Sequence, residues 1–181
     1  MESFPLYTDR LLLREYTDRD DSAVLHVMMQ PQIYAFTAHI PLSCSRAYAA
    51  RWIRSVGAAM RRKISYEFAV TDRDTGAYIG NIGVVRVDRN LHTAEITYWI
   101  DPARQNRGYA TEAGRALLGW AVPALKLETL TGCCMAHNAA SRRVMEKLGF
   151  SFVSHSPHAL YKDGAWIDLD HFICHIQQTA Y

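Results

Sequence analysis

The chain has 181 residues, of which 49% are hydrophobic and 21% are charged, and its formal net charge at pH 7 is +2. This composition excludes a disordered chain, and the small net charge gives no reason to expect direct nucleic-acid binding. No apolar run approaches the roughly 20 residues of a membrane span, and the first nine residues lack the basic and apolar regions of a secretory signal. We therefore expect one cytoplasmic domain over residues 1–181, with no membrane contact.

Hydrophobic periodicity and turn residues predict seven strands and four helices. In chain order they are a strand at 11–15, a helix at 18–29 that ends before Pro31, a helix from Ser43 or Ser45 to about 62, strands at 66–71, 78–87 and 93–100, a helix at 111–122, a strand at 126–135, a helix at 138–148 followed by Gly149, and strands at 150–160 and 166–174. The segment 93–135 is a strand-helix-strand unit, so its two strands should be parallel. The other connections are hairpin-like, which predicts a mixed α/β fold with a mostly antiparallel sheet.

The loop Gln105-Asn106-Arg107-Gly108-Tyr109-Ala110 lies between an expected strand and an expected helix. The first N–H groups of a helix have no intrahelical partner, and the helix dipole adds positive charge there. A phosphate is the commonest occupant of such a site. Glycine at position 108 is expected to matter because a side chain there would hold the backbone away from the phosphate. The chain has neither a P-loop motif nor a dinucleotide fingerprint.

Several motifs together resemble the GNAT acyl-CoA N-acyltransferases, in particular the RimJ/RimL-like branch. The loop is similar to the family's pyrophosphate-binding pattern Q/R-x-x-G-x-G/A. The other resembling segments, in the family's order, are Arg10 to Arg14, Tyr98 to Pro102, Asn138 to Phe150 and Tyr161 to Asp168. The resemblance implies a seven-stranded sheet with about four helices, in which the parallel pair, the fourth and fifth expected strands, splays apart. It also implies direct transfer of an acetyl group from acetyl-CoA, as co-substrate, to a primary amine, without a metal.

The same resemblance implies which residues bind acetyl-CoA. The pyrophosphate should be bound by the loop and helix start, namely Arg104, Gln105, Asn106, Arg107, Gly108, Tyr109, Ala110 and Thr111. A strand bulge at Trp99 and Ile100 should free a backbone N–H to polarise the thioester. Asn138 should reach the pantetheine, although it is also a natural helix N-cap. Lys147 should face the 3′-phosphate, unless it is only a cation at a helix C-terminus.

Glu95 and Ser141 are the expected catalytic residues. Glu95 lies on an apolar strand at the position where family histone acetyltransferases carry their general base, and an ion pair is the alternative. Asp168 or a water held by backbone groups are further candidates for the base. Ser141, three residues after Asn138, could donate to the leaving thiolate, because its helix has no tyrosine; it could equally be an ordinary first-turn serine.

The four cysteines, Cys44, Cys133, Cys134 and Cys174, form no C-x-x-C pair. Cys133 and Cys134 are neighbours on an expected strand and should point to opposite faces of the sheet. We interpret all four as reduced cysteines, because Cys133, Cys134 and His137 fit no standard zinc spacing.

The sequence does not identify the amine that accepts the acetyl group. A protein N-terminal amine, as on a ribosomal protein, is preferred; a polyamine, an amino acid or an aminoglycoside is the alternative. A non-catalytic acyl-CoA binding module and another acyl donor are further hypotheses. The basic helix at 45–62, with Arg51 and Arg54, is either a solvated surface or a site for an acidic or RNA-bound acceptor. The chain is expected to be a monomer or a homodimer.

Overall fold

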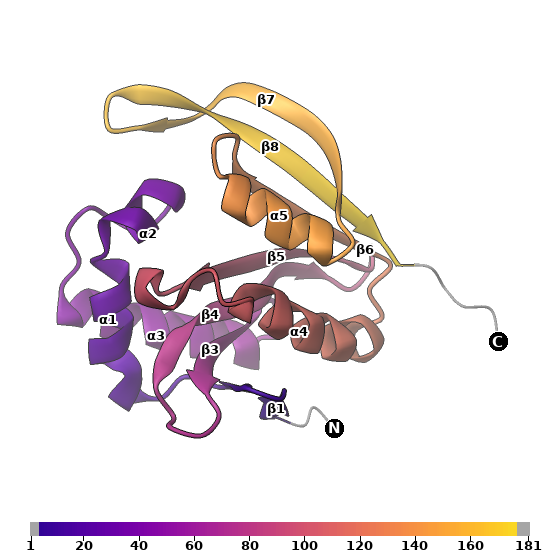
Figure 1. Ribbon diagram of the computed structural model, residues 1–181. Helices are drawn as coiled ribbons and strands as arrows, with labels where there is room; N and C mark the ends of the chain where they lie inside the picture. Colours follow the sequence, from indigo (N-terminus) through magenta and orange to yellow (C-terminus); the bar gives the residue numbers. More distant parts are fainter. Residues whose placement is uncertain (1–3, 177–181) are drawn as a thin grey trace.

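One mixed sheet forms the centre of the molecule (Figure 1). The computed structural model describes residues 4–176, and within them eight strands pair in the order β1-β2-β3-β4-β5-β6-β8-β7. The strands are β1 (Leu6–Tyr7), β2 (Leu11–Arg14), β3 (Tyr66–Asp72), β4 (Tyr78–Asp88), β5 (Thr93–Ile100), β6 (Thr129–Met135), β7 (Ser151–Lys162) and β8 (Ala165–His175). Every neighbouring pair is antiparallel except β5 and β6, which are parallel as predicted.

The described part of the chain contains five α-helices. They are α1 (Asp21–Met28), α2 (Pro31–Phe36), α3 (Arg46–Arg61), α4 (Tyr109–Leu125) and α5 (Ala139–Lys147). Two short 3-10 helices, Asp18–Asp20 and Pro102–Arg104, precede α1 and α4. Figure 1 shows α4 on one face of the sheet and α3 on the other, with the β7–β8 hairpin arching beyond the body of the molecule.

Two apolar clusters stabilise these layers. The larger lies between α4 and the sheet and includes the buried side chains of Phe68, Ile82 and Leu117. The smaller joins α1, α2 and α3 through residues such as Val27 and Ile53. Burial of such side chains is the dominant favourable contribution to folding.

Three sequence expectations need correction. The sheet has an eighth strand, β1, which is too short to give a periodic signal. Pro31 does follow the end of α1, but it also begins α2 at a position where proline is favoured because its missing N–H needs no partner. Helix α4 begins at Tyr109 rather than at residue 111, and it continues through Pro123, which sits in its last turn.

Other local expectations are confirmed. Ser45 is the N-cap of α3, since its hydroxyl accepts a hydrogen bond from the Tyr48 N–H at 3.1 Å. Gly149 follows α5 with φ of 90°, a left-handed conformation that favours glycine. Cys133 is exposed and Cys134 is buried, as alternation along β6 requires.

Candidate functional site

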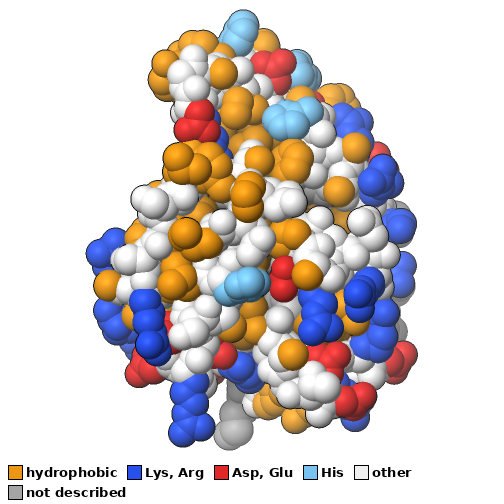
Figure 2. All heavy atoms as spheres, turned by 60° about the vertical axis from the view of Figure 1, so that its left-hand side comes forward, with side chains coloured by type: hydrophobic (Ala, Val, Ile, Leu, Met, Phe, Trp, Pro, Cys, Tyr) orange, Lys and Arg blue, Asp and Glu red, His pale blue; other side chains and the backbone are white. Residues whose placement is uncertain are grey.

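A cleft opens where β5 and β6 separate. The two strands pair only from Thr93–Glu95 to Thr129–Thr131, so β5 has no β6 partner between Ile96 and Ile100. The cleft has a volume of about 720 Å³ and receives side chains from both sides of this splay. That volume lies in the range of small-molecule and cofactor sites. Figure 2 shows hydrophobic side chains gathered in the middle of one face, below the projecting hairpin.

Nearly all of the sequence-predicted site residues line this one cleft. They are Glu95, Trp99, Ile100, Arg104, Gln105, Asn106, Gly108, Tyr109, Ala110, Thr111, Asn138, Ser141 and Lys147. Arg107 is the exception, because its exposed side chain does not line the cleft. The expected contact of Arg107 with pyrophosphate stays a prediction. Arg143 of α5, which sequence reasoning missed, lines the cleft and is a basic group on its opposite wall.

The loop between β5 and α4 has the backbone geometry of an anion site. Asn106 has φ of 61° and Gly108 has φ of 80°, so the chain turns sharply before the free N–H groups of the α4 start. The Gln105 side chain fixes the loop by donating a hydrogen bond to the Ile100 carbonyl at 3.0 Å. A Cβ on Gly108 would lie 3.6 Å from the Arg10 guanidinium, an ordinary contact. The left-handed backbone favours glycine here, and the close approach of a phosphate expected from the sequence stays a prediction.

Arg10 of the segment before β2 braces the same loop. Its guanidinium donates to the Arg107 carbonyl at 3.0 Å and to Glu112 of α4 at 2.8 Å. It also lies over the Tyr109 ring, 4.6 Å from the ring centroid. Arg10 of the N-terminal R-L-L-L-R segment therefore holds the start of α4 in place.

Asn138 and Ser141 are brought together at the start of α5. The Asn138 side chain accepts a hydrogen bond from the Ser141 N–H at 3.0 Å, which confirms it as the N-cap. The Ser141 hydroxyl lies 2.8 Å from the Tyr98 hydroxyl of β5, and the Tyr98 hydroxyl also donates to the Ser141 carbonyl at 3.0 Å. Burial raises the pKa of Tyr98 far above its ordinary value, so its hydroxyl stays protonated. Tyr98 is a hydroxyl partner that sequence reasoning did not assign.

The bulge expected at Trp99 and Ile100 is absent. Pairing of β5 with β4 is regular from Glu95 to Ile100, and the irregularity lies between Val85 and Asp88 of β4 instead. The Trp99 ring packs against Trp52 with a centroid distance of 5.1 Å and belongs to the edge of the smaller apolar cluster. From Ile96 to Ile100, the side of β5 that faces β6 has no strand partner within residues 4–176, because the strands splay and not because β5 bulges.

We call the part of the cleft lined by Tyr48, Trp52, Glu67 and Glu95 the acceptor half. Glu95 lies in this half, on β5. Its carboxylate forms an ion pair with Arg86 of β4 at 3.3 Å, and its side chain is 20% exposed. Both interpretations of Glu95 are thus compatible with the structure, since it faces the cleft and is paired. Asp168, the alternative base, does not line the cleft; it accepts a hydrogen bond from the His158 N–H at 2.8 Å.

Glu67 of β3 is a second carboxylate in the acceptor half that sequence reasoning missed. Burial raises its pKa, although the hydrogen bond from the Asn81 amide, at 2.9 Å, acts against that rise. The same signal that singled out Glu95 was present, because Glu67 is an acidic residue inside an apolar strand.

Helix α3 contributes aromatic residues to the acceptor half. Tyr48 and Trp52 line it, whereas none of the α3 arginines does. Arg46 is instead paired with Asp21 of α1 at 2.6 Å. Contact between the basic surface of α3 and an acceptor inside the cleft is therefore not supported.

The tip of the β7–β8 hairpin is tied to α2 above the acceptor half. Lys162 donates to the Tyr34 and Thr37 carbonyls at the end of α2, with the Thr37 contact at 2.7 Å. Its ammonium lies 3.8 Å from the centroid of the Tyr34 ring, and the Tyr34 hydroxyl donates to Asp163. These contacts join two segments that are distant in sequence, and Figure 1 shows the hairpin tip above α2.

Within residues 4–176, no group of three or more His, Cys, Asp or Glu side chains is placed to hold a metal ion. Over the same residues, no helix has the length and apolar character needed to cross a membrane. Cys134 lies close to Ser141, and burial raises the pKa of its thiol to about 11.

Comparison with known proteins agrees with this geometry. The family model described as Acetyltransferase (GNAT) domain matches residues 10–151. The chain is 28% identical over 166 residues to YoaA of Bacillus subtilis strain 168, an uncharacterized N-acetyltransferase, covering 91% of this chain and 93% of YoaA. It is 23% identical over 158 residues to the L-amino acid N-acetyltransferase AaaT of Escherichia coli K12, covering 87% of this chain and 93% of AaaT.

The fold is also found among solved structures. RimL, a ribosomal-protein alpha-N-acetyltransferase determined in complex with coenzyme A, superposes with a TM-score of 0.87 at 15% identity, covering 96% of this chain and 98% of that chain. At 15% identity, this similarity shows a shared fold and nothing further. Because the family model spans most of the chain, and the cleft carries the loop and side chains that the family pattern implies, the protein belongs to the GNAT acetyltransferase family and is an N-acetyltransferase.

Proposed function

We propose that the protein transfers an acetyl group from acetyl-CoA to the N-terminal amine of a protein, with a ribosomal protein as the preferred kind of acceptor. The observation that carries the proposal is the continuity of the cleft. One cavity joins the anion-binding loop, the Ser141–Tyr98 hydroxyl pair and a half lined by carboxylates and aromatic rings.

The described residues fit acetyl-CoA in that cleft. The N–H groups from Gly108 to Thr111 and the Arg104 side chain would bind the pyrophosphate. Lys147 and Arg143 of α5 are the nearby cations for the 3′-phosphate. The unpaired segment of β5 offers backbone groups to the pantetheine and the thioester, and Asn138 lies at the facing helix start.

Catalysis requires a proton acceptor for the ammonium and a proton donor for the leaving thiolate. A carboxylate in the acceptor half, Glu95 in the sequence-based hypothesis, would take the proton from the amine. Ser141 would donate to the thiolate, with the Tyr98 hydroxyl as the neighbouring hydrogen-bond partner of the Ser141 hydroxyl. The direct attack needs no covalent intermediate on the enzyme.

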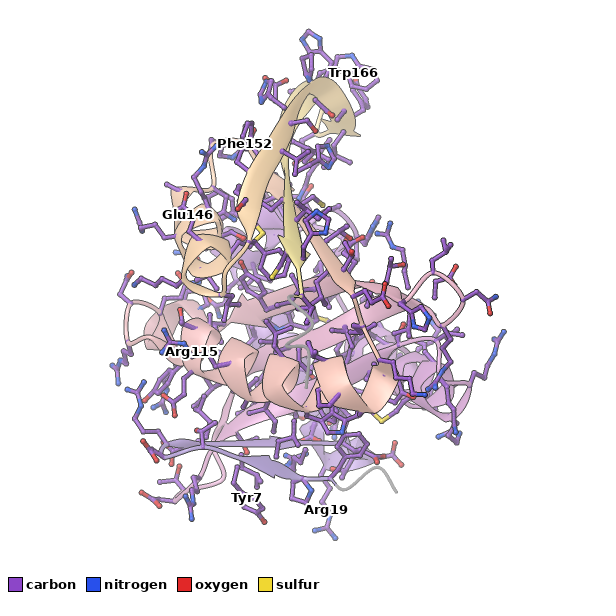
Figure 3. The ribbon with its side chains drawn as sticks, turned by 90° about the vertical axis from the view of Figure 1, so that its right-hand side faces the viewer. Tyr7, Arg19, Arg115, Glu146, Phe152 and Trp166 are labelled. Atoms are coloured by element: carbon purple, nitrogen blue, oxygen red, sulfur yellow. The ribbon has the colours of Figure 1, made fainter. Side chains whose placement is uncertain are left out.

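Exposed aromatic residues at the hairpin tip and at the end of α2 favour a peptide acceptor. Tyr161 and Trp166 lie at the hairpin tip, 61% and 59% exposed, and form a ring pair with a centroid distance of 5.1 Å. Phe36 at the end of α2 is also exposed and lines the cleft. A chain that leaves the cleft would pass over such surfaces. Figure 3 shows Trp166 at the far end of the hairpin, distant from α4.

A small amine acceptor is the second candidate. Lys162 holds the hairpin against Thr37, a residue that lines the cleft, and a cleft bounded on this side suits an acceptor that fits entirely inside. AaaT, a relative of similar length, is an L-amino acid N-acetyltransferase.

Calorimetric titration with acetyl-CoA, followed by thiol-release assays on N-terminal peptides and on small amines, tests the proposal. Turnover on peptides, with acetylation of the α-amine located by mass spectrometry, is the expected result. Turnover only on amino acids, polyamines or aminoglycosides would assign the second candidate. Binding without turnover across the panel would indicate an acyl-CoA binding module, and no binding would contradict the proposed co-substrate.

A further inference from the structure

The strand register places Glu67 on the wall of the acceptor half. Glu67 of β3 lies opposite Gly83 of β4, and Gly83 lies opposite Thr97 of β5. Val85, two residues after Gly83, lies opposite Glu95. Paired residues on neighbouring strands point to the same face, so Glu67, Thr97 and Glu95 share one face of the sheet. All three line the cleft.

Gly83 opens a path for the Glu67 side chain. A Cβ at Gly83 would lie 2.5 Å from the Glu67 Cγ, closer than real Cβ atoms approach. The Glu67 side chain therefore lies over the surface of Gly83, on the way from β3 to β5. Only a residue without a side chain at position 83 allows a carboxylate from β3 to approach β5 across β4.

A buried polar network orients this carboxylate. The Asn81 amide donates to Glu67 Oε2 at 2.9 Å, and the Tyr16 hydroxyl donates to the Asn81 side-chain oxygen at 2.8 Å. Tyr16 is also 3.2 Å from the Tyr78 hydroxyl. Asn81 is fully buried, and its amide orientation is fixed by having a donor on one side and an acceptor on the other. The second oxygen, Oε1, accepts no hydrogen bond from residues 4–176, so it is available to a ligand in the cleft.

The charges around Glu67 differ from those around Glu95. Glu67 forms no ion pair within the described residues, whereas Glu95 is paired with Arg86. The facing titratable groups are Tyr16 and Tyr78, whose pKa values burial raises, so both are neutral. Behind these tyrosines, Arg14 and Asp20 neutralise each other at 2.7 Å. His39, from the loop after α2, lines the cleft and is exposed.

We propose that Glu67 binds the ammonium group of the acceptor and accepts its proton, so that Glu67 rather than Glu95 is the general base of the acetyl transfer that the proposed function assigns to this cleft. An unpaired, partly buried carboxylate attracts a cation, and an incoming ammonium supplies the missing counter-charge. Glu95, already neutralised by Arg86, has less to gain from the same ligand.

The proton and electron balance is complete with these groups. The ammonium N–H proton passes to Glu67 Oε1, directly or through one water, and leaves a neutral amine. The amine lone pair forms the C–N bond to the thioester carbon, and the C–S bond breaks. The second proton passes from the nitrogen to a water in the cleft. The thiolate sulfur takes a proton from the Ser141–Tyr98 pair, which regains one from water, and Glu67 releases its proton to solvent, so that one proton is released in each turnover.

The test compares Glu67→Gln, Glu95→Gln and Glu146→Gln. Gln keeps an oxygen for the Asn81 hydrogen bond but has no basic carboxylate, and Glu146, exposed on α5 and outside the cleft, is the matched control (Figure 3). We expect E67Q to lower kcat/KM about 100-fold at pH 7, the size of a lost general base. E95Q should lose less than E67Q, E146Q should match the wild type, and all variants should bind acetyl-CoA as the wild type does.

The pH dependence distinguishes a base from a merely structural residue. The wild-type kcat/KM should rise with pH as Glu67 and the acceptor amine each lose a proton, and E67Q should retain only the dependence due to the amine. If E67Q fails to fold, Glu67→Asp decides, because it keeps the charge and withdraws it by one methylene; reduced turnover at unchanged acetyl-CoA affinity supports the proposal. An active wild type with an unaltered E67Q profile overturns the role of Glu67 alone. A wild type that acetylates no amine overturns the proposed function instead.

Discussion

The hydroxyl of Tyr98 lies 2.8 Å from the hydroxyl of Ser141, although the two residues are 43 positions apart in the chain. Tyr98 comes from β5 and Ser141 from the first turn of α5, so the pair spans the splay between β5 and β6. Their contact joins the two walls of the cleft at the point where the strands part.

Ser141→Ala should lower kcat without changing acetyl-CoA affinity, because the serine hydroxyl is assigned only to the leaving thiolate. A loss of about 10- to 100-fold is expected, at the lower end of general-acid effects. Tyr98→Phe should give a smaller loss, since Ser141 retains its own proton. Single-turnover and steady-state CoA release, with calorimetry for affinity, measure both variants; a wild-type kcat in S141A would remove Ser141 from the mechanism.

Gly108→Glu should abolish acetyl-CoA binding while the protein remains folded. The backbone there has φ of 80°, which strains any residue with a side chain, and a carboxylate would repel the pyrophosphate. Gly119→Glu is the matched control, because Gly119 is exposed on the same helix and a Cβ there meets nothing within 4 Å. Calorimetric titration and circular dichroism compare the two; tight binding by G108E would contradict the assignment of the loop.

Lys162→Met should raise the acceptor KM and leave acetyl-CoA affinity unchanged. The ammonium of Lys162 holds the hairpin to the end of α2, and methionine keeps the apolar stem without the donors. A KM increase of about threefold to tenfold corresponds to the loss of one or two hydrogen bonds. Lys63→Met, at the exposed end of α3, is the control. An unchanged KM with every accepted amine would show that the tie does not shape the acceptor half.

Asp170→Asn should destabilise the fold, because Asp170 is buried on β8 and accepts hydrogen bonds from Arg142 and, at 2.8 Å, from His155. Loss of the charged acceptor should cost about 2 kcal/mol, which lowers Tm by about 4 to 8 °C. Asp74→Asn, in the exposed β3–β4 turn, should have no such effect.

The same interactions should make the free energy of unfolding depend on pH. The hydrogen bond from His155, and that from Arg142, hold the pKa of Asp170 below its usual range. A lowered carboxyl pKa stabilises the fold above the unfolded value of about 3.9, and the stabilisation is lost as pH falls through the folded pKa. Asp170 raises the pKa of His155 in return, and that contribution is lost as pH rises above about 6.5 through the folded value. Urea unfolding at pH 3, 5 and 7 should show a flatter profile for D170N than for the wild type; parallel profiles would refute the linkage.

Local sequence signals predicted the elements that carry the cofactor loop and the hydroxyl donor. The parallel strands β5 and β6, the N-caps Ser45 and Asn138, and the left-handed Gly149 were all predicted from residues close in the chain. These features depend on capping, turn chemistry and hydrophobic period, which act over a few residues.

Features that depend on distant neighbours were missed or misassigned. Arg10 donates a hydrogen bond to the Arg107 carbonyl, and no local pattern reports that contact. The partnership of Tyr98 with Ser141 and the tie of Lys162 to α2 follow from how α5 and the hairpin pack.

The sequence by itself determined the order of the elements, the family pattern and the residue types available for anion binding and proton transfer, because these are written in short-range spacing. Only the tertiary structure decided which of two strand glutamates is neutralised and which is not. Arg86 is placed against Glu95 by the β4–β5 ladder, while Glu67 lies over Gly83 with Asn81 and Tyr16 behind it. The electrostatic state of a carboxylate is set by the charges and burial that the fold brings around it, and those neighbours come from β4 and from the segment after β2, not from the strands that carry the two glutamates.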